Sequence, residues 1–109
     1  VEICKPIKEV NPEYPFEVTV AQPRKKPTTM GGTDASVFAV KGVPTYGFRE
    51  QDFKGYNFNY GEIWHTERDL YTKSIPEYME HTSVVTAIVA LGVANLKHHL
   101  SREGMYTDQ

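Results

Sequence analysis

A histidine set between an indole and several carboxylates is the feature of this chain with the clearest capacity for chemistry. Residues 63–69 read IWHTERD, so His65 follows Trp64 and precedes Glu67 and Asp69. Imidazole nitrogens and carboxylate oxygens are the ligands of a catalytic zinc ion, which keeps one coordination position open for water. The spacing alone sets no geometry for such a site, and one histidine does not hold a zinc ion. His65 is therefore a candidate ligand that needs partners from elsewhere.

The other histidines and the cysteine form no second metal-binding set in the sequence. His98 and His99 are neighbours on a predicted helix, so their side chains point apart. His81 lies near the start of that helix and is interpreted as a packed or solvated residue. Cys4 is the single cysteine and has no partner for an internal disulfide.

Length and charge limit the classes of function. The chain has 109 residues and a net charge of −2 at pH 7, and its one basic run, at residues 24–26, is interpreted as a solvated loop. Nothing in this balance favours nucleic acid or an anionic membrane as a partner. The longest apolar stretch, residues 84–96, is too short to span a bilayer, so no membrane span is predicted. We expect residues 1–109 to form one domain or part of one.

The first half of the chain has the patterns of strands around a short helix. Apolar and polar residues alternate over residues 16–20, and residues 43–48 resemble a short buried strand. Residues 35–40 predict a helix that Gly42 ends in the left-handed conformation.

The second half predicts a long loop and a long helix. Residues 49–61 are polar and aromatic, and such a loop either carries function or is held to the surface by its aromatic side chains. Ser74, Pro76 and Glu77 form a helix start with a capping box, and apolar spacing continues the helix to residue 100. Its apolar face is expected to pack on a sheet. The order of elements predicts an α/β fold with this helix on the sheet.

Three motifs occur in an order and spacing that resemble the di-zinc exopeptidases: GGTDAS over residues 31–36, GVP over residues 42–44 and WHTERD over residues 64–69. That group of zinc metallopeptidases includes bacterial leucyl aminopeptidases, glutaminyl cyclases and glutamate carboxypeptidases, and the tryptophan form of the last motif is similar to the glutaminyl cyclases. The resemblance covers roughly residues 16–100. It implies a partial three-layer α/β/α sandwich of the zinc exopeptidase type, ending in a long helix packed on the sheet.

The same resemblance implies a role for the residues of the last motif. His65 would bind one of two zinc ions as a neutral imidazole, and Glu67 or Asp69 would accept a hydrogen bond from its second ring nitrogen. Trp64 would line the substrate pocket beside the metals.

Two residues of the first motif are implied to face the substrate. Thr33 resembles a position that contacts substrate in the carboxypeptidase branch. Asp34 is interpreted first as a helix cap that braces the loop, with Thr33 as the other candidate cap, and second as a direct substrate contact.

The remaining ligands of the group are not found in this sequence: a His-x-Asp, a bridging Asp, a Glu pair and a further Asp. One member of the Glu pair is the general base, so no catalytic residue is assigned here, and the chain alone should not hydrolyse peptides. We expect the C-terminal part of an aminopeptidase-like catalytic domain, completed by the rest of that domain or by self-association, with a peptide as substrate. The resemblance alone implies a periplasmic or extracellular location.

Three alternatives remain at this stage. Zinc carboxypeptidases and deacylases of the related branch carry a similar Gly-Gly-Thr-Asp-Ala stretch, although residues 64–69 fit the aminopeptidase side better. A peptidase-like binding domain without catalysis would explain the missing ligands. A structural α/β domain with chance motif matches is the third.

Overall fold

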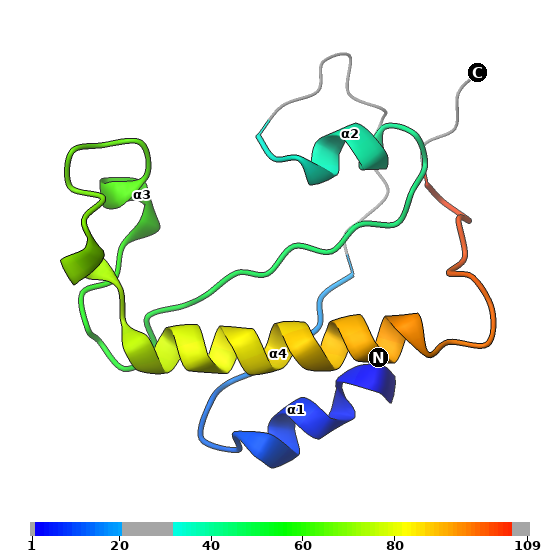
Figure 1. The fold of residues 1–109 in the computed structure, drawn as a ribbon, viewed down its shortest axis with the longest axis horizontal. Helices are drawn as coiled ribbons and strands as arrows, with labels where there is room; N and C mark the ends of the chain where they lie inside the picture. Colours follow the sequence, from blue (N-terminus) through cyan, green and yellow to red (C-terminus); the bar gives the residue numbers. More distant parts are fainter. Residues whose placement is uncertain (1, 21–31, 106–109) are drawn as a thin grey trace. The chain divides into compact units, whose positions relative to one another are not determined.

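The structure is a computed structural model that describes residues 2–20 and 32–105, so the basic run at residues 24–26 and Gly31 lie outside it. The chain divides into two units, Val1–Val18 with Arg49–Leu96 and Thr19–Phe48 with Lys97–Gln109, and each is described by itself. The helical elements, shown in Figure 1, are η1 (Glu2–Cys4), α1 (Lys5–Val10), α2 (Ala35–Ala39), α3 (Tyr60–Ile63), η2 (Tyr71–Lys73) and α4 (Pro76–Ala94).

The long predicted helix is present as α4, with different ends. Pro76 occupies the first turn as predicted, because its fixed φ and missing N–H suit that position. The predicted capping box is absent: the N-cap is Ile75, and the Ser74 hydroxyl donates to the Tyr71 carbonyl at 2.6 Å instead. The helix ends at Ala94, because the backbone of Asn95 leaves helical geometry. The sequence pattern predicts its continuation to residue 100. None of the described helices has the length and apolar character needed to cross a membrane.

The core of the first unit lies between α1 and α4, which run side by side in Figure 1. Ile7 of α1 is fully buried against Val85 and Val89 of α4. Burying a side chain of this size contributes about 1.5–3 kcal/mol. The apolar spacing of α4 therefore identified buried positions correctly, but the face that it buries packs on a helix and not on a sheet.

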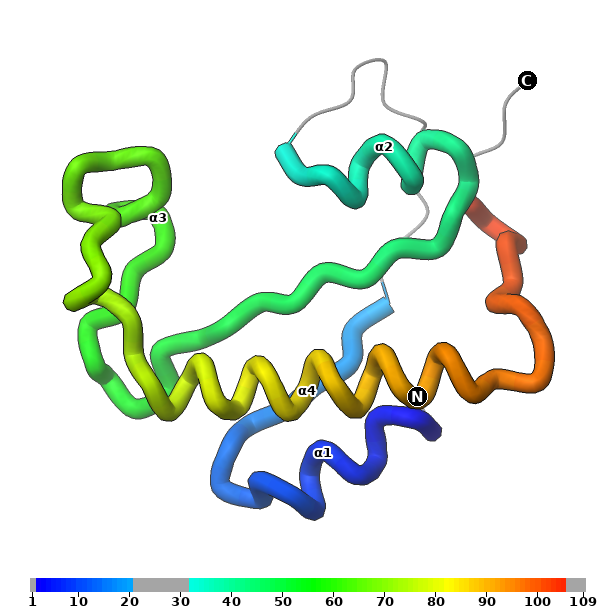
Figure 2. Tube along the Cα trace, in the orientation of Figure 1, coloured from blue at the N-terminus to red at the C-terminus, as the bar shows by residue number. Residues whose placement is uncertain are grey.

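The described residues contain no β-strand. The predicted α/β fold, the three-layer α/β/α sandwich and the packing of the long helix on a sheet are therefore wrong. Residues 43–48 follow an uncoiled path after α2 (Figure 2), and residues 16–20 are likewise irregular. A strand needs a neighbour whose N–H and C=O groups pair with its own. Alternation of apolar and polar residues indicates a segment that could bury one face as a strand. It does not indicate whether a partner strand is present.

In the second unit, α2 ends as the sequence predicts. Gly42 has a φ of 72°, in the left-handed region that favours glycine. Its N–H donates to the Ala39 carbonyl at 2.9 Å, and the Val43 N–H donates to the Phe38 carbonyl at 3.1 Å. This pair of bonds is the Schellman arrangement, which satisfies carbonyls that the helix end leaves free.

Gly92 of α4 provides a test of how closely η1 packs on this helix. A Cβ added at Gly92 would lie 2.8 Å from the Cβ of Ile3 and 3.2 Å from its Cγ2. In an open helix, Gly→Ala gains about 1 kcal/mol, whereas overpacking costs about 1–3 kcal/mol. We expect Gly92→Ala to lower the free energy of unfolding by about 1 kcal/mol, measured by urea denaturation with circular dichroism at 222 nm.

Gly47→Ala is the matched control, because a Cβ there meets nothing within 4 Å and the backbone φ is not left-handed. Its free energy of unfolding should match that of the wild type. A Gly92→Ala chain more stable than the wild type would contradict the close packing of η1 on α4.

Candidate functional site

His65 lies in the turn that follows α3. Its φ is 57°, a left-handed value that few residues other than glycine adopt, although histidine is among the types enriched there. The Thr66 hydroxyl donates to the carbonyls of Glu62 and Ile63 at 3.1 and 2.9 Å, and so closes the end of the helix. The side chain of His65 is exposed. The turn thus holds the backbone of His65 in a strained conformation and leaves its imidazole open to solvent.

Trp64 forms an aromatic wall next to this imidazole. Its indole ring lies 4.3 Å from the His65 ring, centroid to centroid, and stacks on Tyr60 of α3 at 5.9 Å. The indole remains 49% exposed. An apolar surface and an imidazole are therefore both exposed on one short turn.

Glu67 and Asp69, the predicted acceptors for the second ring nitrogen, make no hydrogen bond to His65 in the described part of the chain. Residues 2–20 and 32–105 also contain no group of three or more His, Cys, Asp or Glu side chains that could hold a metal ion. The described donor set therefore does not fit a complete zinc centre.

Thr33 and Asp34 lie in the second unit, directly before α2, and both are exposed. Asp34 occupies the N-cap position, but its side chain makes no capping hydrogen bond. The Ser36 N–H and hydroxyl bond to the Thr33 carbonyl instead, at 3.0 and 2.7 Å. The predicted side-chain cap is wrong, because a backbone carbonyl satisfies the groups that it would have bound. Contact of either residue with substrate stays a prediction, and Trp64 and His65 belong to the other unit.

The long loop that precedes α3 is tied to α4 by polar side chains that the sequence analysis did not single out. Three alternate loop residues each bond to a different residue of α4: Glu50 with Thr82, Asp52 with Tyr78, and Lys54 with Glu77. Aromatic contacts add to these bonds: the Phe53 ring lies 5.0 Å from that of Tyr14 and 5.6 Å from that of Tyr78. The sequence allows two interpretations of residues 49–61: a functional loop, or a loop held to the surface by its aromatic side chains. These contacts agree with the second.

Glu77 is the most strongly perturbed carboxylate of this cluster. Hydrogen bonds from Lys54, Tyr56 and Tyr14 lower its pKa to about 2 against the opposing effect of burial. The bond to Glu77 in turn raises the pKa of Lys54. A general base needs a pKa near the working pH. The lowered pKa of Glu77 therefore marks a structural ion pair with Lys54.

Asp52 is also held in its ionised form. Burial raises its pKa, but hydrogen bonds from the Tyr56 N–H, the Tyr78 hydroxyl and the Phe58 N–H together lower it below the usual value. The sequence contains a local signal for this turn: Gly55 and Asn57 follow Asp52, with φ values of 73° and 61°. Asp followed by residues that tolerate left-handed backbone is typical of a side-chain-capped turn.

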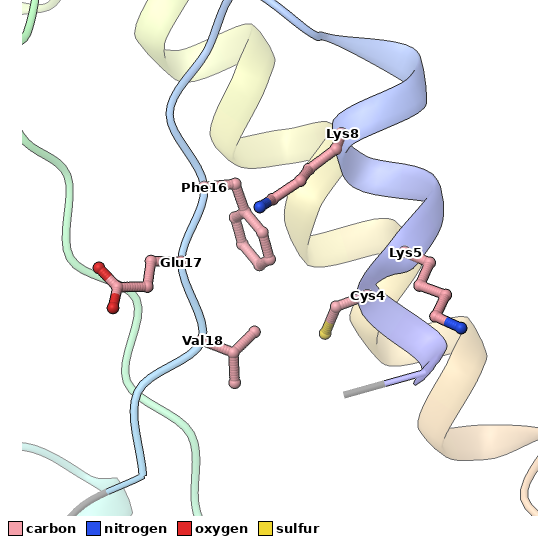
Figure 3. Close-up of a pocket in the computed structure, with 6 residues that line it drawn as sticks. All are labelled: Cys4, Lys5, Lys8, Phe16, Glu17 and Val18. Carbon is pink, nitrogen blue, oxygen red and sulfur yellow. The ribbon is translucent and has the colours of Figure 1, made fainter.

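A hollow of about 270 Å³ lies between α1 and the extended segment that follows it. Figure 3 shows the side chains of Phe16 and Val18 directed into it, with Cys4 facing them from η1 and Glu17 directed away. Lys5 and Lys8 complete its lining. None of the predicted site residues lies in this hollow.

A family model described as peptidase family M28 matches residues 3–90, more than half of the chain. The chain belongs to peptidase family M28. Searches of curated proteins and of solved structures found no match.

M28 peptidases are zinc exopeptidases of the aminopeptidase and glutaminyl cyclase type. The resemblance to di-zinc exopeptidases is thereby confirmed, and so is a function of the zinc metallopeptidase kind. The roles of His65 and Trp64 in this M28 chain stay a prediction. The described residues contain no group of three or more potential metal ligands.

The ion pair of Glu77 predicts how the stability of the chain depends on pH. A carboxylate whose folded pKa is depressed stabilises the fold above its unfolded pKa, and this contribution is lost as the pH falls through the folded pKa. For Glu77 the ordinary value is 4.5 and the folded value is about 2. We expect the free energy of unfolding to fall over this range, and Glu77→Gln to flatten the profile, as measured by denaturation at a series of pH values.

Glu80→Gln serves as the control, since Glu80 is an exposed carboxylate on the same helix. It should leave the pH profile unchanged. A Glu77→Gln profile as steep as that of the wild type would show that this ion pair does not control acid stability.

Proposed function

We propose that this M28 chain is the C-terminal portion of a zinc-dependent, aminopeptidase-like catalytic domain, in which His65 is one metal ligand and Trp64 part of the substrate pocket. The observation that carries the proposal is the His65 turn: a histidine with a left-handed φ of 57°, exposed, with its ring 4.3 Å from an exposed indole. In a family of zinc peptidases, that arrangement suits a ligand open to groups from another part of the site.

In this proposal, residues 2–20 and 32–105 contribute one imidazole to the metal site. As a ligand His65 would be neutral, with one ring nitrogen on the metal and the other donating to an acceptor. The described residues contain no group of three potential ligands, so the others come from the rest of the catalytic domain or from a second copy. Hydrolysis then requires the assembled domain, because this chain contributes no general base.

The side chains proposed to contact substrate are apolar in the first unit and polar in the second, and each is considered by itself. The exposed face of Trp64 suits an apolar side chain of a peptide. The exposed carboxylate of Asp34 suits a free α-amino group, and the Thr33 hydroxyl adds a polar contact. An acidic contact favours a peptide with a free amino terminus over an acylated amino acid, which lacks that charge. This contrast separates the aminopeptidase branch from the carboxypeptidase and deacylase branch.

A second candidate function is a peptidase-like binding domain without catalysis. It is favoured by the absence of a group of three metal-ligating side chains from the described residues. Such a domain would use the exposed indole of Trp64 and the turn around it as a contact surface for peptide, with no need for zinc.

Zinc content is the first test of the proposal. The purified chain is equilibrated with a modest excess of zinc, desalted and subjected to elemental analysis. We expect far less than one zinc ion per chain, because a single imidazole ligand does not retain the metal through desalting. Two tightly held zinc ions per chain would contradict the proposal, since the site would then be complete without other ligands.

The assembled peptidase tests His65 directly. We expect His65→Ala to remove about one zinc ion per active site and to lower kcat/KM for an aminoacyl p-nitroanilide by more than about 100-fold, since loss of even an outer-shell partner costs 10–100-fold. His99→Ala is the matched control, because His99 is exposed and outside the turn. Unchanged zinc content and activity in His65→Ala would exclude His65 as a ligand. Peptide binding without hydrolysis by the zinc-loaded wild type would favour the binding domain.

A further inference from the structure

The carboxylate of Asp52 joins three groups from two parts of the first unit. Its Oδ1 accepts from the Tyr56 N–H and from the Tyr78 hydroxyl, both at 2.8 Å. Its Oδ2 accepts from the Phe58 N–H at 3.0 Å. Tyr78 belongs to α4 and is 2% exposed, so the carboxylate fastens a turn of the loop to a buried residue of the longest helix.

This turn leads directly into the helix that carries the candidate site. Asn59 follows Phe58, and its side chain caps α3 by accepting from the Gly61 N–H at 3.1 Å. The end of α3 carries Trp64, whose N–H donates to the Tyr60 carbonyl at 2.9 Å, and then His65. The place where Phe58 is held therefore sets where α3 begins and where the imidazole and indole lie.

The helix α3 is a single turn of four residues and contributes no buried residue. An isolated helix of one turn is not stable in water, because the cost of nucleation exceeds the gain from one or two hydrogen bonds. The position of α3 must therefore be imposed at its ends. One end continues through η2 into α4, and the other is the turn held by Asp52.

We propose that Asp52 is a positioning residue for Trp64 and His65, acting through its bonds to Tyr78, Tyr56 and Phe58. An ionised carboxylate that accepts from several donors forms stronger hydrogen bonds than a neutral acceptor and suits this purpose. The proposal rests on the proposed function in one respect, namely that His65 is a metal ligand. It identifies a residue outside the zinc-peptidase motif that controls the geometry of the site.

The side chain of Tyr56 also contacts α4 from within this turn, through a hydrogen bond to Glu77 and through its ring 5.6 Å from that of Tyr78. The other polar contacts between the loop and α4 lie before the turn. Glu50 bonds to Thr82 and Lys54 bonds to Glu77, and neither contacts residues 56–58 through its side chain. Loss of the Asp52 carboxylate therefore leaves the loop attached to α4 by Lys54, by the packing of Phe53 and by the side chain of Tyr56. It removes the bond to the Phe58 N–H, directly before the Asn59 cap of α3. The expected consequence is local release of α3 and its turn while α4 stays folded.

Trp64 is the single tryptophan of the chain, so its fluorescence reports on this turn without any label. Time-resolved fluorescence anisotropy measures how far the indole reorients within nanoseconds. We expect the residual fluorescence anisotropy of Trp64 to be lower in Asp52→Ala and in Tyr78→Phe than in the wild type. The helix content of both variants, measured by circular dichroism, should be unchanged. Asp52→Asn should retain part of the anisotropy, because the amide oxygen still accepts from the backbone N–H groups. Glu50→Gln weakens the neighbouring hydrogen bond between Glu50 and Thr82. The residual anisotropy of this variant should match that of the wild type.

Wild-type anisotropy in both Asp52→Ala and Tyr78→Phe would overturn the positioning role. If Asp52→Ala does not fold, Tyr78→Phe decides, since it keeps the aromatic ring and both backbone bonds to Asp52. It removes the hydroxyl that donates to Asp52 and accepts from the Lys54 N–H at 3.0 Å. These measurements need no zinc and so do not depend on the proposed function.

A second measurement tests whether the hydrogen bonds of Asp52 affect zinc binding. In the assembled peptidase, Asp52→Ala should weaken zinc binding by about 10- to 100-fold, the size of effect seen when a ligand loses its support. Asp52→Asn should restore part of that affinity. Unchanged zinc affinity together with lost anisotropy would overturn the link to the metal site. If instead His65→Ala leaves zinc content unchanged, the proposed function fails, and the anisotropy result still decides whether Asp52 holds the turn.

Discussion

The side chain of Ile7 is fully buried between α1 and the Val85 and Val89 side chains of α4, and the rest of the first unit is arranged around that contact. This contact determines which face of α4 is covered by α1. The loop before α3 contacts other residues of α4, among them Tyr78 and Thr82. Close packing continues toward the end of the helix, where Gly92 leaves room for Ile3. A core this small contributes a limited part of the stability, so polar and aromatic contacts outside it have more weight.

Those contacts are concentrated at the first turns of α4. Lys54 and Glu77 form an ion pair to which the Tyr14 hydroxyl adds a hydrogen bond, and Asp52 is bonded to Tyr78 one residue further along the helix. Both carboxylates have lowered pKa values, which is the behaviour of groups that stabilise a structure in the ionised form. Trp64 and His65, the residues proposed to act in the site, lie in sequence between the loop and α4, at the end of α3. There the Thr66 hydroxyl bonds to the Glu62 and Ile63 carbonyls.

Membership of peptidase family M28 and the described architecture give different kinds of information. The family match covers residues 3–90 and identifies the kind of function, a zinc metallopeptidase. The described residues contain helices and irregular segments only, and no group of three or more potential metal ligands. Family motifs are short, and each can keep its local conformation without the partners that complete a site. Exposed side chains such as Trp64 and His65 are in keeping with a surface that other groups complete.

Local signals in the sequence determined the features that depend on a few neighbouring residues. Gly42 ends α2 in the left-handed conformation, and Pro76 opens α4, because the backbone preferences of glycine and proline act at their own positions. The apolar spacing of α4 identified Val85 and Val89 as buried. The motif around His65, together with the two motifs before it, indicated a zinc exopeptidase from sequence alone.

Only the tertiary structure decided what each of these elements meets. Sequence spacing showed an apolar face on α4, but Ile7 covers it where a sheet was expected. The predicted strands lack partners within the described residues. Ser74 and Asp34 do not form their predicted caps: the Ser74 hydroxyl donates to the Tyr71 carbonyl, and the Thr33 carbonyl accepts from the Ser36 N–H. The bond between Asp52 and Tyr78 joins residues 26 positions apart. Local preference acts over one or two turns of chain, whereas burial, strand pairing and hydrogen bonds of this kind depend on segments that only folding brings together.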